Sequence, residues 1–336
     1  MIHSKAARRS VLLLAPLLAI VSLVGCSATS DSASGGASAD DAAWSFTDDT
    51  GKTVSLDHEP TRIASYADYA LGLLSTGVEP VAVFGRVKVK SDERFDDYDL
   101  SKTAIVGNSY GEIDLEKLAD AAPDLIVAGV YPTDRKGTIS KDEPYYSLAD
   151  KEQQTQLEKI APIVAIKVGG KGSDVIESVN KLATALGADP ATIADAKKTY
   201  DTAAADLTAA AEESKLEVTQ MYADADGVYV VKPGDEPETE LYRSLGVDFT
   251  DIHPDGEYYW DKYSWENAAQ MMTGDVLLVN VEGFQKKDLL DQATFAGHPA
   301  LAAGQVYAWN DTALDYASQA EHMVELAKIL RGAKKV

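Results

Sequence analysis

The chain has 336 residues, of which 31 are Lys or Arg and 54 are Asp or Glu, so its formal net charge at pH 7 is −23. Nucleic-acid binding draws its affinity from Lys and Arg, so the acidic balance excludes a nucleic-acid partner. About 290 residues remain after the N-terminal segments described next, more than one hydrophobic core usually supports, and two lobes are therefore expected.

The first 26 residues have the layout of a secretory signal. Basic residues that include Arg8 and Arg9 precede an apolar run from Val11 to Val24, and the sequence LVGC ends at Cys26. A cysteine at the cleavage site is typical of bacterial lipoproteins, in which residues 1–25 are removed and the thiol carries a lipid. The run of 14 residues contains a proline, whereas a transmembrane anchor needs about 20 apolar residues. We expect lipid anchoring at the extracytoplasmic face of the cell membrane. The sequence does not decide whether the chain is exported by the Sec route or by the twin-arginine route.

The remaining chain divides by composition. Residues 26–43 are rich in Ser, Ala, Gly and Asp with almost no apolar bulk, which predicts a flexible tether. The folded body is expected to begin near Trp44. We expect an N-terminal lobe over 44–170, an interlobe helix over 171–189 and a C-terminal lobe over 190–336.

One layout occurs once in each half of the chain. Asp114 and Ser264 are suited to N-capping, and each stands two residues before a glutamate, Glu116 or Glu266. A short helical pattern then leads into an apolar strand, DLIVAG in the first half and DVLLVN in the second. Continuous apolar strands that alternate with helices are typical of parallel sheets covered on both faces. The sequence therefore predicts two α/β lobes with mainly parallel sheets.

Between the halves, apolar residues from Val175 to Leu186 follow a helical period, with a break at Gly187 to Pro190. One long helix, or two in succession, must therefore join the lobes. A single connecting helix can act as a stiff strut that limits hinge motion.

In the order and spacing of its segments, the chain resembles the substrate-binding lipoproteins of ATP-binding-cassette (ABC) importers for iron-siderophores, haem and cobalamin. The segments include TVSLDHEPTRIAS, TGVEPVAVFG, GEIDLEKLADAAPDLIVAG, YSWENAAQMMTGDVLLV and HPALAAGQVYAWN. The resemblance implies a class III periplasmic-binding-protein-like body, with two lobes on one long helix and the ligand between them. It also implies a surface glutamate on each lobe that docks onto basic residues of the permease dimer.

Glu116 and Glu266 match these docking positions. A glutamate in the first turn of a helix is also stabilised by the helix dipole, by roughly 0.3–1 kcal/mol, and this needs no partner. The docking hypothesis therefore rests on the resemblance and on the occurrence of one such glutamate in each half.

Aromatic residues flank many of the predicted strands. Ligands of open α/β lobes lie beyond the carboxyl ends of the strands. Tyrosine and tryptophan side chains are stiff and have a polar tip, so they suit a ligand with an apolar backbone and a polar metal centre. The expected ligand contacts are Tyr66, Tyr69, Tyr110, Tyr131, Trp260, Tyr263 and Trp309, with Arg86 and Lys232 as cations. For each of them, a packing or solvated-loop role is the alternative.

The ligand is expected to be a ferric hydroxamate. Tyr131 and Trp309 match aromatic positions of hydroxamate-siderophore members, whereas Tyr110 stands where those members can carry an arginine. Ferric triscatecholates carry several negative charges and need a cluster of Arg or Lys, and few of the cations here fall in pocket loops.

Other functions have weaker support in the sequence. Haem or cobalamin remains an alternative, because His253 or a tyrosine could ligate iron. The four histidines after the signal are not paired at ligand spacing, so we expect no metal site. An envelope enzyme is the other alternative, but the sequence has no G-x-S-x-G elbow, phosphate loop or free nucleophilic cysteine. We therefore expect a monomeric binding protein with no catalytic residue and no resident cofactor, which carries iron only within the ligand.

Overall fold

The computed structural model describes residues 42–271, 273–310 and 313–336. The predicted signal peptide, Cys26 and nearly all of the predicted tether lie outside these residues. Within them, no helix combines the length and the apolar character that a membrane span requires.

The N-terminal lobe is built on a five-stranded sheet with the order β5-β4-β3-β6-β7, in which every neighbouring pair is parallel. An antiparallel hairpin of β1 and β2 precedes it. The elements are β1 (Trp44–Thr47), β2 (Thr53–Leu56), β3 (Ile63–Tyr66), α1 (Ala67–Ser75), β4 (Ala82–Phe84), η2 (Val89–Ser91), η3 (Glu93–Phe95), β5 (Ala104–Gly107), α2 (Leu115–Asp120), β6 (Leu125–Val130), α3 (Lys151–Ile160) and β7 (Ile163–Lys167).

The C-terminal lobe has a mixed sheet. Its strands follow the order β11-β9-β8-β12-β13, and β10 also pairs with β8. The pairs β8-β12, β12-β13 and β8-β10 are parallel, whereas β8-β9 and β9-β11 are antiparallel. The elements are β8 (Glu217–Ala223), β9 (Gly227–Val231), α6 (Pro237–Ser244), β10 (Asp248–Phe249), β11 (Trp260–Ser264), η4 (Trp265–Met271), β12 (Val276–Asn280), α7 (Lys286–Leu290), α8 (Pro299–Ala302), β13 (Val306–Trp309) and α9 (Tyr316–Gly332).

The predicted strands with continuous apolar sequence are the buried centres of these sheets. All six residues of β6 are buried, and the first four of β12 are buried as well. Helices cover both faces of such strands, so no face is left for polar side chains. The two-lobe α/β fold predicted from the sequence is confirmed, with a fully parallel sheet only in the first lobe.

The internal repeat is visible in the hydrogen bonding at the heads of these strands. Asp124, just before β6, accepts from the backbone N–H groups of Thr61 and Arg62, both at 2.9 Å. Asp275, just before β12, accepts from the N–H of Glu217 at 2.9 Å. In each lobe, one aspartate therefore ties the start of a central strand to the start of its parallel neighbour.

Asp275 also holds the C-terminus of the chain. Its carboxylate accepts from the N–H of Val336 at 3.0 Å and contacts the Lys335 Nζ at 2.8 Å. Burial raises the pKa of Asp275, but the bonds from Lys335, Val336 and Glu217 outweigh it, so the pKa lies below its usual value of 3.8. As the pH falls, the unfolded chain protonates this carboxyl before the folded protein does. The contribution of Asp275 to the stability is therefore complete above the pKa of the unfolded chain, and it is lost as the pH falls through the pKa of the folded protein.

The substitution Asp275→Asn should lower the free energy of unfolding at pH 7 by about 1–3 kcal/mol, because buried N–H groups lose their carboxylate acceptor. Chemical denaturation of both proteins over a pH series measures the effect. We expect the deficit to shrink as the pH falls below about 4, where the unfolded wild-type chain begins to take up this proton. A deficit that is the same at every pH would show that the charge of Asp275 contributes nothing.

Two helices in succession connect the lobes. Helix α4 (Gly172–Ala185) ends near Gly187, which has a positive φ of 83°. Helix α5 (Pro190–Ser214) then starts with a proline in its first turn and with Asp189 as its cap, which accepts from the Ala191 N–H at 2.9 Å. The long helix is therefore α5, and the segment 171–189 predicted for this role is the shorter α4.

Helix α4 contributes to the cores of both lobes. Val175 and Val179 belong to the N-terminal core, whereas Ile176 belongs to the C-terminal core. The first strand of the C-terminal lobe begins at Glu217, after α5, and the predicted lobe boundaries stay a prediction.

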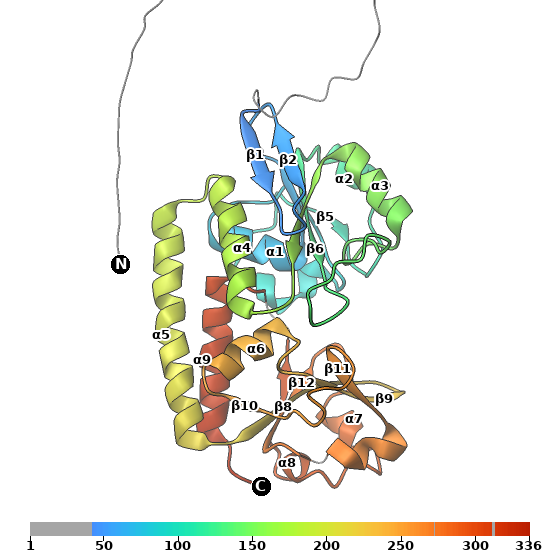
Figure 1. Cartoon of the computed structure of the whole chain (residues 1–336), viewed down its shortest axis with the longest axis vertical. Helices are drawn as coiled ribbons and strands as arrows, with labels where there is room; N and C mark the ends of the chain where they lie inside the picture. Colours follow the sequence, from blue (N-terminus) through green and yellow to red (C-terminus); the bar gives the residue numbers. More distant parts are fainter. Residues whose placement is uncertain (1–41, 272, 311–312) are drawn as a thin grey trace, which may run out of the picture. The chain divides into compact units, whose positions relative to one another are not determined.

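Helix α9 lies beside α5 (Figure 1). The rings of Tyr200 and Tyr316 are 5.2 Å apart, and Arg331 contacts Asp206 at 2.7 Å. Asp315, the N-cap of α9, also lies 3.4 Å from the hydroxyl of Ser75 in the N-terminal lobe. The connecting strut is thus a pair of packed helices that contacts both lobes.

Candidate functional site

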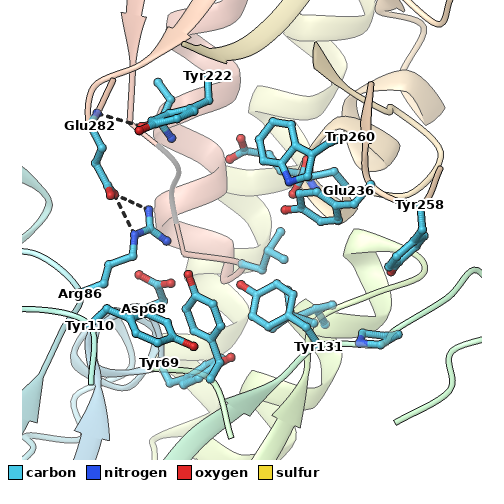
Figure 2. Close-up of a pocket in the computed structure, with 18 of the residues that line it drawn as sticks. Asp68, Tyr69, Arg86, Tyr110, Tyr131, Tyr222, Glu236, Tyr258, Trp260 and Glu282 are labelled. Carbon is cyan, nitrogen blue, oxygen red and sulfur yellow. Dashed lines mark hydrogen bonds and ion pairs between the residues drawn. The ribbon is translucent and has the colours of Figure 1, made fainter. Parts of the chain in front are cut away.

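A cavity of about 650 Å³ lies between the lobes (Figure 2). This volume falls in the range of about 300–1,000 Å³ that is usual for small-molecule sites. Eight aromatic side chains line it: Tyr69, Tyr110, Tyr131, Tyr146, Tyr222, Tyr258, Tyr259 and Trp260. Four carboxylates line it as well: Asp68, Glu236, Glu238 and Glu282. Among the described residues of the wall, Arg86 is the one cationic side chain.

Every strand of the N-terminal sheet delivers a residue to this wall from its carboxyl end. Tyr69 follows β3, Arg86 follows β4, Tyr110 follows β5, Tyr131 follows β6 and Val168 follows β7. Parallel strands end at the same edge of a sheet, so these side chains meet there. The reversal of strand order at β3 and β6 opens the crevice.

In the C-terminal lobe, only part of the wall follows the same rule, because β9 runs antiparallel to β8 and its carboxyl end lies at the opposite edge of the sheet from the carboxyl ends of β12 and β13. Glu236 follows β9, Glu282 follows β12 and Leu314 follows β13. Trp260 begins β11, and because β11 runs antiparallel to β9, it lies opposite Val231 at the carboxyl end of β9. Residues from both lobes therefore line one common space, although those of the C-terminal lobe do not all come from one edge of its sheet.

Tyr146 is the centre of the aromatic wall in the N-terminal lobe. Its ring lies 4.6 Å from that of Tyr131, 5.5 Å from that of Tyr110 and 5.6 Å from that of Tyr66. Its N–H bonds to the carbonyl of Gly129 in β6 at 2.8 Å, which fixes it beside the sheet. Tyr146 was not among the predicted contacts, because it lies in the long segment between β6 and α3 and follows no strand directly.

The phenols of this wall are uncharged at neutral pH. Burial raises the pKa values of Tyr69 and Tyr131 well above 10, and burial also raises the pKa of Tyr146. A phenolate is therefore costly here, and the hydroxyls are available as neutral hydrogen-bond donors.

Five of the predicted contacts lie on the wall, namely Tyr69, Arg86, Tyr110, Tyr131 and Trp260. Tyr110 is the most open of the large hydrophobic residues in the N-terminal lobe, with 54% of its surface exposed. Figure 2 shows Tyr110 and Tyr69 near the Arg86 side chain, with Tyr131 across from Trp260.

The other four predicted contacts are not on the wall. Tyr66 is 1% exposed and packs against Phe84, with its ring 6.0 Å away. Trp309 is also 1% exposed and donates from its indole nitrogen to Glu238 at 3.2 Å. Both aromatics belong to lobe cores, because the last residue of a strand can face the core as readily as the open end of the sheet.

Lys232 and Tyr263 are held away from the wall by neighbouring polar groups. Lys232 is buried, contacts Asp261 at 3.2 Å and donates to the carbonyl of His253. The hydroxyl of Tyr263 lies 3.2 Å from His253 Nδ1, and its ring packs in the core of the C-terminal lobe. Neither side chain lines the cavity, and their contact with a ligand stays a prediction.

Two ion pairs cross the space between the lobes. Arg86 donates to Glu282 with N–O distances of 2.8 and 2.7 Å. Arg135 forms a bidentate pair with Asp235 at 2.8 and 2.7 Å. The cation predicted at Arg86 is therefore present on the wall, paired with a carboxylate of the opposite lobe.

The family model described as periplasmic binding protein matches residues 63–313 of the chain. The chain belongs to this family. The match spans the cavity-lining loops of both lobes as well as the helices between them.

Solved structures of similar proteins support the membership. DesE, a ferric-siderophore receptor protein from Streptomyces coelicolor, is 31% identical with a TM-score of 0.76, covering 87% of this chain and 99% of that one. A siderophore periplasmic binding protein from the fuscachelin gene cluster of Thermobifida fusca is 25% identical with a TM-score of 0.59, covering 82% and 97%. Staphylococcus aureus SirA, solved with staphyloferrin B, shares the fold at 20% identity with a TM-score of 0.62, covering 87% and 99%. A comparison with curated proteins returns no match.

In this periplasmic binding protein, the two predicted docking glutamates are exposed in the first turns of short helices. Glu116 lies in α2, and Glu266 lies in η4, which is a 3₁₀ helix. Asp150 and Glu152 repeat the same spacing at the start of α3. The sequence pattern therefore marks helix starts in general, and docking needs a functional test.

If the ligand is haem, His253 is a predicted iron ligand. The imidazole of His253 is 57% exposed and lies outside the cavity wall. Among the described residues, no histidine, methionine or cysteine lines the cavity.

Proposed function

We propose that this protein captures a ferric siderophore of the hydroxamate type between its lobes and delivers it to an ABC permease. The observation that carries this proposal is an aromatic cavity with four carboxylates and, among its described residues, a single arginine. Three hydroxamate groups neutralise Fe(III), so their complex has an uncharged centre. A ferric triscatecholate has three negative charges and would meet four carboxylates in a low-dielectric space.

The similar proteins support the ligand class. DesE is a ferric-siderophore receptor protein, and the Thermobifida fusca protein is a siderophore periplasmic binding protein. We extend to this chain the function of a binding protein, with iron as cargo, no resident cofactor and no catalytic step. A monomer that meets a permease dimer through Glu116 and Glu266 belongs to the same proposal.

The wall suggests how such a complex is held. Tyr131 and Tyr146 supply stiff apolar surface for the backbone of the ligand, and their neutral hydroxyls can donate to hydroxamate oxygens. Arg86 can turn part of its guanidinium to the same oxygens, because that planar group has five N–H donors. The packed helices α5 and α9 limit hinge motion, so we expect small lobe movement on binding.

Quenching of tryptophan fluorescence tests the ligand class. Trp260 is the one tryptophan of the four on the cavity wall, and the structure describes all four. A ferric trihydroxamate should quench saturably, whereas a ferric triscatecholate, haem and cobalamin should not. Saturable binding of the triscatecholate, haem or cobalamin without binding of the trihydroxamate would overturn the proposal.

Lipid anchoring through Cys26 is part of the proposed function and rests on the sequence LVGC. The substitution Cys26→Ala should release the protein from membranes, because a proline-interrupted apolar run is too short to anchor it. Fractionation of cells that express the wild type or the Cys26→Ala variant measures how much of each protein is in the membrane fraction. A processed variant that still sediments with membranes would count against the anchor.

A further inference from the structure

Three aromatic residues of the cavity wall are consecutive in the sequence, namely Tyr258, Tyr259 and Trp260. Tyr259 has a positive φ of 72°, and the Trp260 N–H bonds to the carbonyl of Tyr258 at 3.0 Å. Both features are typical of a γ-turn with a positive φ at its centre, which is rare and strained. In Figure 2, Tyr258 and Trp260 lie on the opposite side of the cavity from Arg86 and Glu282. Residues 258–260, the aromatic turn, therefore depend on neighbours that hold this backbone in place.

Asp235 is one of these neighbours. Its carboxylate accepts from the Tyr259 N–H at 3.0 Å, at the strained centre of the aromatic turn. The side chain of Asp235 is only 5% exposed. A buried carboxylate is costly unless a cation pairs with it, so the position of Asp235 depends on the cation that it meets.

That cation comes from the other lobe. Arg135 lies in the N-terminal lobe between β6 and α3, and it forms the bidentate pair with Asp235 at 2.8 and 2.7 Å. The same guanidinium donates to the carbonyls of Gly256 at 2.9 Å and Glu257 at 3.0 Å, the two residues before the aromatic turn. One planar, rigid group therefore fixes both the carboxylate that holds the turn and the backbone that leads into it.

Arg135 is itself presented by a tight turn of the N-terminal lobe. The Asp134 carboxylate accepts from the N–H groups of Lys136 at 2.9 Å and Thr138 at 3.1 Å. The Gly137 N–H bonds to the carbonyl of Asp134 at 3.0 Å. The N-terminal lobe thus holds the backbone of Arg135 in a defined place, from which the side chain reaches the C-terminal lobe.

We infer that Arg135 is a positioning residue, which sets the aromatic turn of the C-terminal lobe on the cavity wall while the lobes lie together. This inference rests on the proposed function and adds to it a residue that does not line the cavity. Separation of the lobes breaks the pair with Asp235, so the turn loses its support and its hold on the ligand weakens. Ligand release is thereby coupled to lobe opening.

Hydrogen exchange of the ligand-free protein, measured by mass spectrometry, tests the positioning. Arg135→Ala should speed exchange severalfold in the peptide 256–261, although the Tyr259 N–H donates to Asp235 and not to the arginine. Arg331→Ala is the matched control, because Arg331 forms a bidentate pair with Asp206 at 2.9 and 2.7 Å, outside the cavity. Exchange of the peptide 256–261 in this control should equal that of the wild type.

Fluorescence titration with a ferric trihydroxamate tests the consequence for binding. Arg135→Ala should weaken binding about tenfold, whereas Arg331→Ala should bind as the wild type does. Asp235→Asn keeps an acceptor for the Tyr259 N–H but loses the charge that Arg135 meets, so a similar loss is expected. The double variant should bind no more weakly than Arg135→Ala alone, because both changes act through one pair.

The outcomes separate the two claims. If the wild type does not bind the ferric trihydroxamate, the proposed function fails, and hydrogen exchange still decides whether Arg135 sets the turn. Unchanged exchange or unchanged affinity in Arg135→Ala would show that the inference is wrong, as would additive losses in the double variant. Should Arg135→Ala fail to fold by circular dichroism, the exchange and the affinity of Asp235→Asn decide in the same way.

Discussion

Replacement of Glu116 or Glu266 by arginine should abolish uptake of the ferric complex into cells, while its affinity for the isolated protein stays unchanged. Both glutamates are exposed and neither lines the cavity. If they meet arginines of the permease, charge reversal sets like charges against each other across the interface, which costs several kcal/mol.

The control for this prediction is Glu325→Arg on α9, which makes the same charge change at an exposed site with no expected docking role. It should support normal uptake of radiolabelled ferric siderophore. If the two glutamates only stabilise their helices, Glu116→Arg and Glu266→Arg would instead transport normally and lose about 0.3–1 kcal/mol of stability. Normal transport in both variants would therefore refute docking at these positions.

The substitution Tyr131→Ala should weaken binding of a ferric trihydroxamate by about 1–3 kcal/mol, the loss expected for truncation of an aromatic anchor. The side chain lines the cavity and supports Tyr146, whose ring lies 4.6 Å away. Fluorescence titration measures the change, with circular dichroism to show that the fold is kept.

Tyr200→Ala is the matched control, because Tyr200 packs on Tyr316 between α5 and α9 and lies outside the cavity. Its affinity should equal that of the wild type. Unchanged affinity in Tyr131→Ala would remove the strand-end tyrosines from the binding site. Trp309, a predicted contact by the same argument, is now expected to act only through Glu238, which it holds by a hydrogen bond.

The sequence allowed the fold and part of the wall to be predicted. Apolar strands that alternate with helices imply parallel sheets, and the ends of such strands meet at one edge. Arg86, Tyr110 and Tyr131 each come shortly after a strand, so this rule places them at the cavity. The repeated aspartates at positions 124 and 275 likewise marked the heads of equivalent strands.

The positions of the other residues could not be predicted from their distance to the end of a strand. Tyr66 and Trp309 are the last residues of their strands, and the pleat turns both into the core. Lys232 is removed from the wall by a partner on the neighbouring strand, Asp261. Glu236 and Glu238 lie in the polar stretch GDEPETE, where composition alone cannot distinguish a solvated loop from a helix start that faces a cavity.

Anomalous diffraction at the iron edge, from crystals grown with a ferric trihydroxamate, shows directly where the protein holds the iron. We expect one strong iron peak in the interlobe cavity, within contact distance of a ligand that touches Tyr131, Arg86 and Trp260. An iron peak outside this cavity, such as one at the exposed imidazole of His253, would contradict it.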